Sequence, residues 1–298
     1  MRISSHQFHL NSIQNIQFNT KNFNEASVQM STNQRINKPS DDPLGAVMLL
    51  NLDAELGELS QYESNMSAVN FNLGQQEVQL NAIVNQIYSL QSLITTAADG
   101  TMGTSELKAL GQEMAMTFPA IVDALNATNS DGGYYFSGSE TKTKPFTLDA
   151  SGKYIYNGDD QVRNVAVSQD SSVPSNITGN NLDPDAQFLN AMQDYLQVIT
   201  NPPAEGVGEQ SRDMIDMLGV FTGTITSELT NIGGTLSSLD SLTISNEDIS
   251  TFTTQLRDEV STIDYPEAFI KLNESLAAYE SSMKVYSRVT SLSLFSLI

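Results

Sequence analysis

His6 and His9 are the only histidines in the chain, and they lie three residues apart. On a helix this spacing places both imidazoles on one face, as in many pairs of metal ligands. No carboxylate and no third imidazole stands close to them in the sequence. We therefore expect no metal site at this pair.

Acidic pairs and serines offer little more chemistry. No acidic pair has the Asp-x-Asp-x-Asp-Gly spacing of a calcium loop, so we interpret all of them as helix starts and turn residues. The pairs are Asp41/Asp42, Asp159/Asp160 and Asp183/Asp185. A serine triad could draw only on the two terminal histidines, and neither a phosphate loop nor a nucleophile elbow occurs. The sequence predicts no catalytic site, no cofactor and no enzyme.

The composition excludes further classes of protein. The 298 residues carry a net charge of −21 and contain no cysteine, which rules out disulfides, zinc ribbons and thiolate nucleophiles. Nucleic-acid binders display clustered basic residues, so we expect no nucleic-acid partner. No apolar run approaches the roughly 18 residues that span a bilayer, and the N-terminus lacks the apolar core of a secretory signal. Residues 1–40 differ from the rest because four basic residues face one acid, a local charge of +3.

The strongest structural signal is a seven-residue repeat. Its first positions are Leu52, Leu59, Met66, Leu73, Leu80, Ile87 and Ile94, and its companion positions are Glu55, Tyr62, Val69, Gln76, Ile83, Leu90 and Ala97. A repeat sustained this long predicts a helix with a coiled-coil seam. We expect this helix over residues 44–98, with Pro43 in its first turn and Gly100 beyond its end.

Apolar side chains recur every three or four residues in several other segments. They predict helices over residues 105–128, 188–199, 218–242, 249–263 and 266–286, and a looser one at the N-terminus. We expect the two heptad helices to pair, a break at residues 245–248, and a helix start at Pro266. Asn201 and two prolines should end the helix before them.

Residues 134–182 have a different texture, with short aromatic and β-branched runs between turn formers. The runs are 134–136, 146–148, 154–156 and 162–167. Ser151-Gly152 and Asn157-Gly158 are turn formers, and an Asn-Gly pair suits a tight hairpin. We interpret the segment as a small β insertion.

The sequence therefore predicts a mainly α fold. Its N- and C-terminal segments should form a long antiparallel helical coiled-coil rod, with a small β insertion domain in the middle. The expected domains are terminal helices for assembly and export (1–40 plus 265–298), a helical rod (41–131 plus 183–264) and the β insertion (132–182).

Both ends carry apolar stripes, and exposed apolar surface usually marks an interface. The last residues are especially apolar. We expect an assembly interface at the two ends, formed by Ile3, Leu10, Ile13, Ile16, Leu292, Leu294, Phe295 and Leu297.

Several motifs resemble those of the bacterial flagellins and their hook-associated relatives. The segment Met30-Ser-Thr-Asn-Gln-Arg-Ile-Asn37, followed by Ser40-Asp-Asp-Pro-Leu-Gly-Ala46, is similar to the N-terminal motif of that family. Tyr135-Phe-Ser-Gly-Ser-Glu-Thr141 and Pro145-Phe146 resemble the entry to the variable domain of its hook–filament junction proteins. The motif residues are Arg35, Ile36, Asn37, Ser40, Asp41, Asp42, Pro43, Gly45, Tyr135, Phe136, Gly138, Pro145 and Phe146.

The resemblance implies a structural protein of the flagellum that joins the hook to the filament. Its implied partners are further copies of itself in a ring-like layer, hook-associated protein 1, flagellin, and an export chaperone at the C-terminal helix. It implies export through the flagellar type III apparatus, an extracellular position, and no insertion into a membrane.

Two alternatives of related kind remain open. Flagellins, the filament subunits, share the Arg-Ile-Asn motif, although their endings resemble Val-Leu-Ser-Leu-Leu rather than the Leu-Ser-Leu-Phe-Ser-Leu-Ile found here. Another secreted coiled-coil assembly protein would have the heptads without the motifs.

Overall fold

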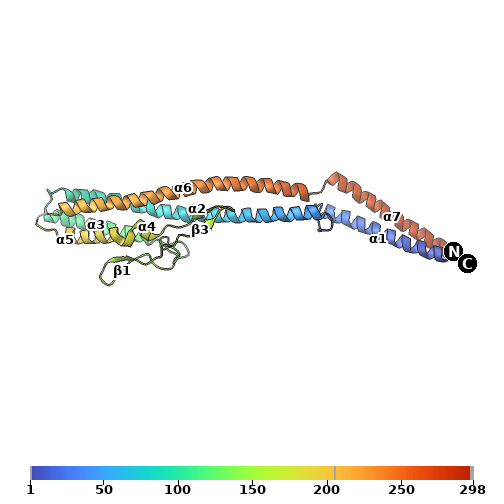
Figure 1. The fold of residues 1–298 in the computed structure, drawn as a ribbon, viewed down its shortest axis with the longest axis horizontal. Helices are drawn as coiled ribbons and strands as arrows, with labels where there is room; N and C mark the ends of the chain where they lie inside the picture. Colours follow the sequence, from blue (N-terminus) through green and yellow to red (C-terminus); the bar gives the residue numbers. More distant parts are fainter. Residues whose placement is uncertain (1, 205, 296–298) are drawn as a thin grey trace. The chain divides into compact units, whose positions relative to one another are not determined.

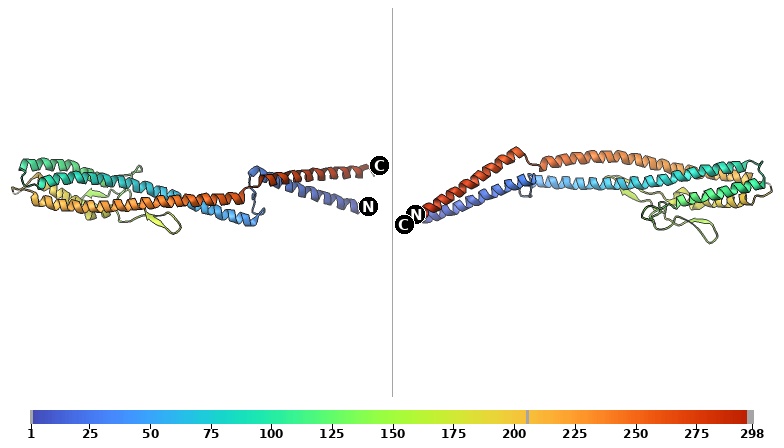
Figure 2. Two further views of the ribbon diagram at one scale, coloured as in Figure 1. Left: turned by 90° about the horizontal axis from the view of Figure 1, so that it is seen from above. Right: turned by 180° about the vertical axis from the view of Figure 1, so that it is seen from behind.

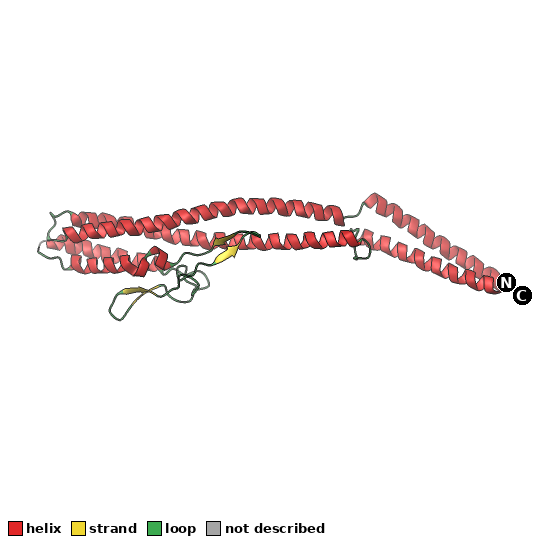
Figure 3. Ribbon diagram, in the orientation of Figure 1, coloured by secondary structure: helices red, strands yellow, loops and turns green. Residues whose placement is uncertain are grey.

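The computed structural model describes residues 2–204 and 206–295 and confirms a mainly α fold with a small β insertion (Figure 1, Figure 3). The chain divides into two compact units. Unit 1 comprises residues 1–58 and 247–298, and unit 2 comprises residues 59–246. Two long helices, α2 (Pro43–Ala98) and α6 (Gly208–Ser261), each contribute to both units.

Unit 1 is built on a pair of antiparallel helices, α1 (Arg2–Thr32) and α7 (Tyr265–Phe295), which lie side by side (Figure 2). The Phe23 and Tyr279 rings stack with centroids 6.3 Å apart, and the Asn19 side-chain amide donates to the Ala278 carbonyl at 3.3 Å. Pro266 stands in the first turn of α7, as predicted. Asp264 caps that turn by accepting the Glu267 amide at 3.2 Å.

The seam of α2 is buried from Met66 to the end of the helix, which confirms the heptad prediction over that part of unit 2. All ten of its positions from Met66 onward are at most 2% exposed: Met66, Val69, Leu73, Gln76, Leu80, Ile83, Ile87, Leu90, Ile94 and Ala97. On α6 the predicted heptad residues Leu218, Ile225, Ile232 and Leu239 are buried in the same core. The apolar face of each helix thus covers that of the other.

Within unit 2, α2 and α6 are antiparallel. The Asn246 side-chain amide donates to the Leu59 carbonyl at 3.0 Å, and the Thr243 hydroxyl lies 3.6 Å from the Met66 sulfur. These contacts also correct one prediction, because α6 continues without a break through residues 245–248. Asn246 is 8% exposed and satisfies its polar group on the facing helix, so the polar residues here do not end the helix.

Two shorter helices, α3 (Thr104–Leu125) and α5 (Gln187–Thr200), complete the helical core of unit 2. On α5, Phe188 stacks on Phe221 of α6 with ring centroids 4.0 Å apart. The helix ends before Asn201 and the two prolines, as predicted. It is preceded by the short elements α4 (Gly179–Leu182) and η1 (Pro184–Ala186).

The β insertion consists of two separate antiparallel hairpins. Strand β1 (Phe146–Leu148) pairs with β2 (Tyr154–Tyr156), and β3 (Asn164–Ala166) pairs with β4 (Ser172–Pro174). The predicted run at residues 134–136 forms no regular strand and contributes only an isolated bridge between Thr128 and Tyr134.

The hairpin turn prediction was right at one position and wrong at the other. Ser151-Gly152 lies in the β1–β2 turn, where Gly152 has a φ of +79° and Asp149 accepts the Ser151 and Lys153 amides at 2.8 Å. Asn157-Gly158 follows β2 and closes no hairpin, because β2 pairs backward with β1 and β3 pairs forward with β4. The Asn157 side-chain amide instead donates to the Thr147 hydroxyl across the first hairpin, at 2.6 Å.

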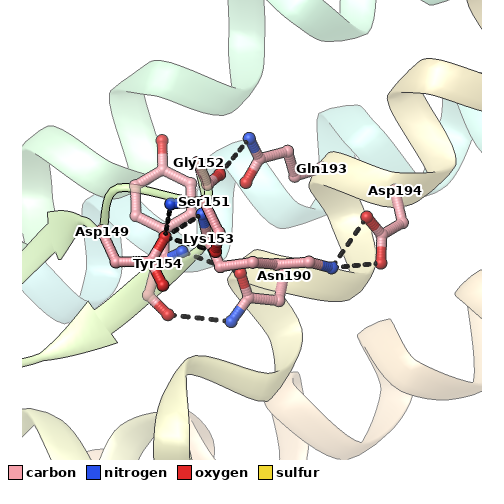
Figure 4. A network of polar contacts seen from close by, with 8 residues as sticks. All are labelled: Asp149, Ser151, Gly152, Lys153, Tyr154, Asn190, Gln193 and Asp194. Carbon is pink, nitrogen blue, oxygen red and sulfur yellow. Dashed lines mark hydrogen bonds and ion pairs between the residues drawn. The ribbon is translucent and has the colours of Figure 1, made fainter.

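The first hairpin is fixed to α5 by polar contacts (Figure 4). Asn190 pairs with both backbone groups of Tyr154, at 2.8 and 2.9 Å, and Gln193 donates to the Gly152 carbonyl at 2.8 Å. The Lys153 ammonium lies 2.7 Å from the Asp194 carboxylate. The turn is therefore held as a rigid part of unit 2.

Candidate assembly interface

The N-terminal motif forms the connection between α1 and α2 and ties it to the end of α6. The Arg35 amide donates to the Ser261 carbonyl at 2.7 Å. Its guanidinium donates twice to the Val260 carbonyl, at 3.1 and 3.3 Å, and once to the Asp42 carboxylate at 3.0 Å. The last carbonyls of a helix have no partners within it, so Arg35 caps the C-terminus of α6.

The acids of this motif organise the start of α2, as the sequence predicts. Asp42 accepts the Gly45 amide at 3.0 Å, and Asp41 accepts the Asn37 and Lys38 amides at 3.1 and 3.0 Å. The Gly45 amide and the Arg35 guanidinium lower the pKa of the Asp42 carboxyl. Asp42 therefore caps the start of α2, whereas Asp41 fixes the loop that precedes the helix.

Close packing explains two more motif residues. The Ile36 side chain is only 8% exposed, and a Cβ atom added at Gly45 would collide with its terminal methyl group. Pro43 is the first residue of α2, where a missing amide hydrogen costs nothing. Ser40 is exposed at the rim of a hollow along α1.

The second motif is a folding element of the β insertion. Phe136 and Phe146 are 0% and 1% exposed in the core of unit 2. Gly138 has a φ of +73°, and a Cβ atom there would overlap Asp159. Pro145 is buried and Tyr135 half-buried. These residues stabilise the fold of the insertion. We therefore do not assign them to contacts with other molecules.

The structure describes only some of the side chains that the sequence assigns to an assembly interface at the chain ends. Leu10 is 42% exposed, and Ile13 and Ile16 are half-buried on α1. Ile3, Leu292, Leu294 and Phe295 fall within α1 and α7, but their side chains lie outside the described residues, as does the whole of Leu297. Their role in assembly stays a prediction.

Unit 1 also exposes large apolar side chains that the sequence reasoning did not single out. On α1, Phe18 is 63% exposed, and on α7 Phe269 and Ile270 are each 59% exposed. At the start of α2, Leu44 and Leu50 are 85% and 69% exposed. A surface of this kind is typical of a protein–protein interface.

The residues with catalytic or metal-binding potential lie apart. The His9 ring lies against Tyr286 with centroids 5.3 Å apart, and the side chain of His6 is outside the described part. Among the residues that the structure describes, no three histidine or acidic side chains form a metal-binding group. Across the same residues, no helix is both long and apolar enough to cross a bilayer.

Asp183 is a buried acid with a raised pKa. It is 2% exposed and accepts the Phe188 and Leu189 amides at the start of α5, at 2.8 and 3.1 Å. Burial raises its pKa from 3.8 to about 6, although the backbone donors act in the opposite direction. It is a structural cap, and its neighbour Asp185 occupies a left-handed turn with a φ of +51°.

Sequence reasoning missed two buried amides that position the insertion. Gln76, a polar residue in the heptad seam, accepts the Ile177 amide at 2.9 Å and is 1% exposed. Asn126 pairs with both backbone groups of Phe146, at 2.9 and 3.1 Å. The available signal was the polar residue at an otherwise apolar heptad position.

Comparisons with known proteins agree with this architecture. Residues 3–141 match the family model described as the bacterial flagellin N-terminal helical region. Flagellar hook-associated protein 3 of Escherichia coli strain K12 is 23% identical over 317 aligned positions, which cover 100% of this chain and 99% of the relative. The chain is thus similar to the flagellins at its N-terminal end and to hook-associated protein 3 over its whole length. The resemblance drawn from the motifs is thereby confirmed.

Solved structures show the same fold in hook-associated proteins. A flagellar hook-associated protein from Vibrio parahaemolyticus has a TM-score of 0.69 at 22% identity, covering 74% of this chain and 100% of that one. The flagellar junction protein FlgL from Legionella pneumophila has a TM-score of 0.57 at 17% identity, covering 71% and 100%. These hook-associated folds therefore extend over most of the present chain.

Proposed function

We propose that this chain is a structural component of the bacterial flagellum that joins the hook to the filament. The observation that carries the proposal is the alignment with hook-associated protein 3, which spans essentially the full length of both chains. A relative that matched only the terminal helices would favour any flagellin-like protein equally. Here the β insertion and its entry motif are included.

The exposed apolar side chains of unit 1 support an assembly role for the terminal helices. We assign residues 1–40 and 265–298 to assembly and export, residues 41–131 and 183–264 to the helical support, and residues 132–182 to the insertion. The expected contacts are further copies in a ring-like layer, hook-associated protein 1 on the hook side and flagellin on the filament side. Burial of Phe18, Phe269 and similar residues on assembly would stabilise the contacts.

Export through the flagellar type III apparatus, with a chaperone at the C-terminal helix and a final extracellular position, completes the proposal. An amphipathic helix such as α7 gains stability mainly from packing, so a chaperone that covers its apolar stripe would replace α1 as a partner before assembly. A filament-subunit role and a generic coiled-coil assembly role are less well supported, because neither accounts for the full-length match.

The position of the protein in the flagellum tests the proposal. A short epitope tag inserted at the exposed Gln169–Asp170 turn between β3 and β4 avoids the first hairpin, which is fixed to α5. We expect immunogold label confined to the boundary between hook and filament in cells that carry the tagged chain. Label along the whole filament would support a filament subunit instead, and unlabelled flagella would contradict both roles.

A further inference from the structure

Unit 1 contains a hollow of about 760 Å³ beside α1 whose walls are unusually basic for this chain. Ile16 and Val28 contribute apolar surface, and Lys21, Lys38 and Lys271 surround it. Two acids also line the hollow. Of these, Glu25 lies 3.6 Å from Lys21, and Asp41 is engaged by two backbone amides of the loop. In a chain of net charge −21, a hollow with more lysines than acids and with apolar surface is complementary to an acidic helix face that carries an apolar side chain.

A ridge with the complementary chemistry lies on α6, also in unit 1. Asp248, Phe252, Gln255 and Glu259 follow one another at intervals of four, three and four, which places them on one helix face. All four are exposed, and Phe252 is 66% exposed, so it does not fill the hollow of its own chain. The ridge therefore presents an aromatic anchor between two carboxylates.

The two surfaces also agree in length. At 1.5 Å per residue, Asp248 and Glu259 are about 16 Å apart along α6, and Ile16 and Val28 are about 18 Å apart along α1. A helix that lies in a groove is recognised through anchors spaced in this way.

We propose that the α6 ridge of one copy of this chain docks in the α1 hollow of a second copy. Phe252 packs against Val28 at one end of the hollow, while Asp248 and Glu259 face the lysines. Because ridge and hollow are different surfaces, the contact is heterologous, and each copy can use both at once. Such contacts build rings or helical layers rather than closed dimers. The inference rests on the proposed function, since it names the contact by which copies assemble.

Cysteine cross-linking tests this contact directly, because the chain contains no cysteine of its own. The double variant Val28→Cys/Phe252→Cys, assembled into flagella and oxidised, should give a covalent ladder of dimers and higher species. Each single variant should stay monomeric. The control Val28→Cys/Tyr88→Cys uses an exposed residue of unit 2 (58% exposed) and should give no ladder.

Charge reversal tests the electrostatic part. Asp248→Lys/Glu259→Lys, added to the cross-linking pair, should reduce the ladder about fivefold, because two favourable ion pairs become repulsive. Lys21→Glu/Lys271→Glu in the same chain should restore it. Circular dichroism of each purified variant checks that the helices are intact.

Three outcomes would overturn the inference while leaving the proposed function standing. Motile cells that carry filaments but give no cross-linked ladder would show that the ridge does not dock in the hollow. Dimers of the single Phe252→Cys variant would indicate a symmetric contact. A covalent bond only to another flagellar protein would give the hollow a different occupant. Loss of the tag signal from the hook–filament boundary would instead contradict the function itself.

Discussion

Arg35 connects three parts of unit 1 with one side chain. It caps the end of α6 through the Val260 carbonyl and pairs with Asp42 at the start of α2. Its partners lie 225 and 7 residues away in the sequence. A motif at residues 30–46 thus fixes a helix end that is formed near residue 260.

Replacing Arg35 by Ala should loosen this helix end without unfolding the chain. A cation at a helix C-terminus contributes about 0.3–1 kcal/mol, so amides near residues 33–37 and 258–262 should exchange up to about fivefold faster. Hydrogen exchange read by mass spectrometry measures the effect. The control Lys38→Ala removes a neighbouring cation. It keeps the backbone amide of residue 38, which donates to the Asp41 carboxylate. Equal exchange in both variants would count against the capping role.

Asp183 should make the stability of unit 2 depend on pH in an unusual direction. Its folded pKa of about 6 exceeds the usual 3.8, so the folded state holds the proton more tightly. The resulting stabilisation is complete below about pH 4 and is lost as the pH rises through 6. Carboxyl groups with lowered pKa values, such as that of Asp42, act below this window.

Urea unfolding at pH 5 and pH 7 checks this expectation. The free energy of unfolding should be about 1–2 kcal/mol higher at pH 5, and Asp183→Asn should abolish that difference. Asp185→Asn is the matched control, because Asn accepts the left-handed backbone at that position. A pH dependence that survives in Asp183→Asn would assign it to another group.

At the scale of elements, burial distinguishes two neighbouring residues of α2. Leu80 is 0% exposed in the seam, whereas Val78 is 60% exposed on the same helix. Leu80→Asp places an unpaired charge in the core and should cost roughly 3–5 kcal/mol. Val78→Asp should change the stability by less than about 0.5 kcal/mol. Thermal melts followed by circular dichroism measure the stability of both variants. Similar melting temperatures for the two would contradict the assignment of Leu80 to a buried seam.

The elements that local patterns specify were predictable. Seven-residue spacing from Leu52 to Ile94 predicts α2, and proline positions predict where α5 ends and α7 begins. Local patterns do not show which distant residue a given side chain or strand contacts. From sequence alone, Asn246 predicts a helix end, because its hydrogen bond to the Leu59 carbonyl on the facing helix is not visible there. Asn157-Gly158 likewise predicts a hairpin turn, because the sequence does not show that β2 pairs with β1.

The candidate assembly interface was likewise predictable only in part. Apolar stripes at the chain ends indicated an interface, but the exposed Phe18 and Phe252 depend on which helix faces remain uncovered. Those faces are decided by α1–α7 and α2–α6 pairing across most of the sequence. The motif residues were recognisable from sequence, whereas the capping role of Arg35 required the end of α6.

At the scale of the molecule, the apolar C-terminal residues should be needed for assembly and dispensable for the core. Removing residues 292–298 leaves intact the unit 2 core, which lies within residues 59–246. We expect an unchanged melt of unit 2, and cells with hooks but without filaments. A control chain keeps the apolar residues and replaces Ser291, Ser293 and Ser296 by Ala. Swimming cells with the truncated chain would remove these residues from the assembly interface.

The helix pairs are nested in the sequence: α3 and α5 are innermost, α2 and α6 lie on either side of them, and α1 and α7 are outermost. The entropy cost of closing a loop grows with its length, and about 230 residues separate α1 from α7, against about 60 between α3 and α5. Local pairs form faster than distant ones, so the chain should fold from its middle outward. Synthesis runs in the other order, from α1 to α7. Among the described helices, α1 is therefore synthesised first but finds its partner last, and α1 stays uncovered until α7 has been synthesised.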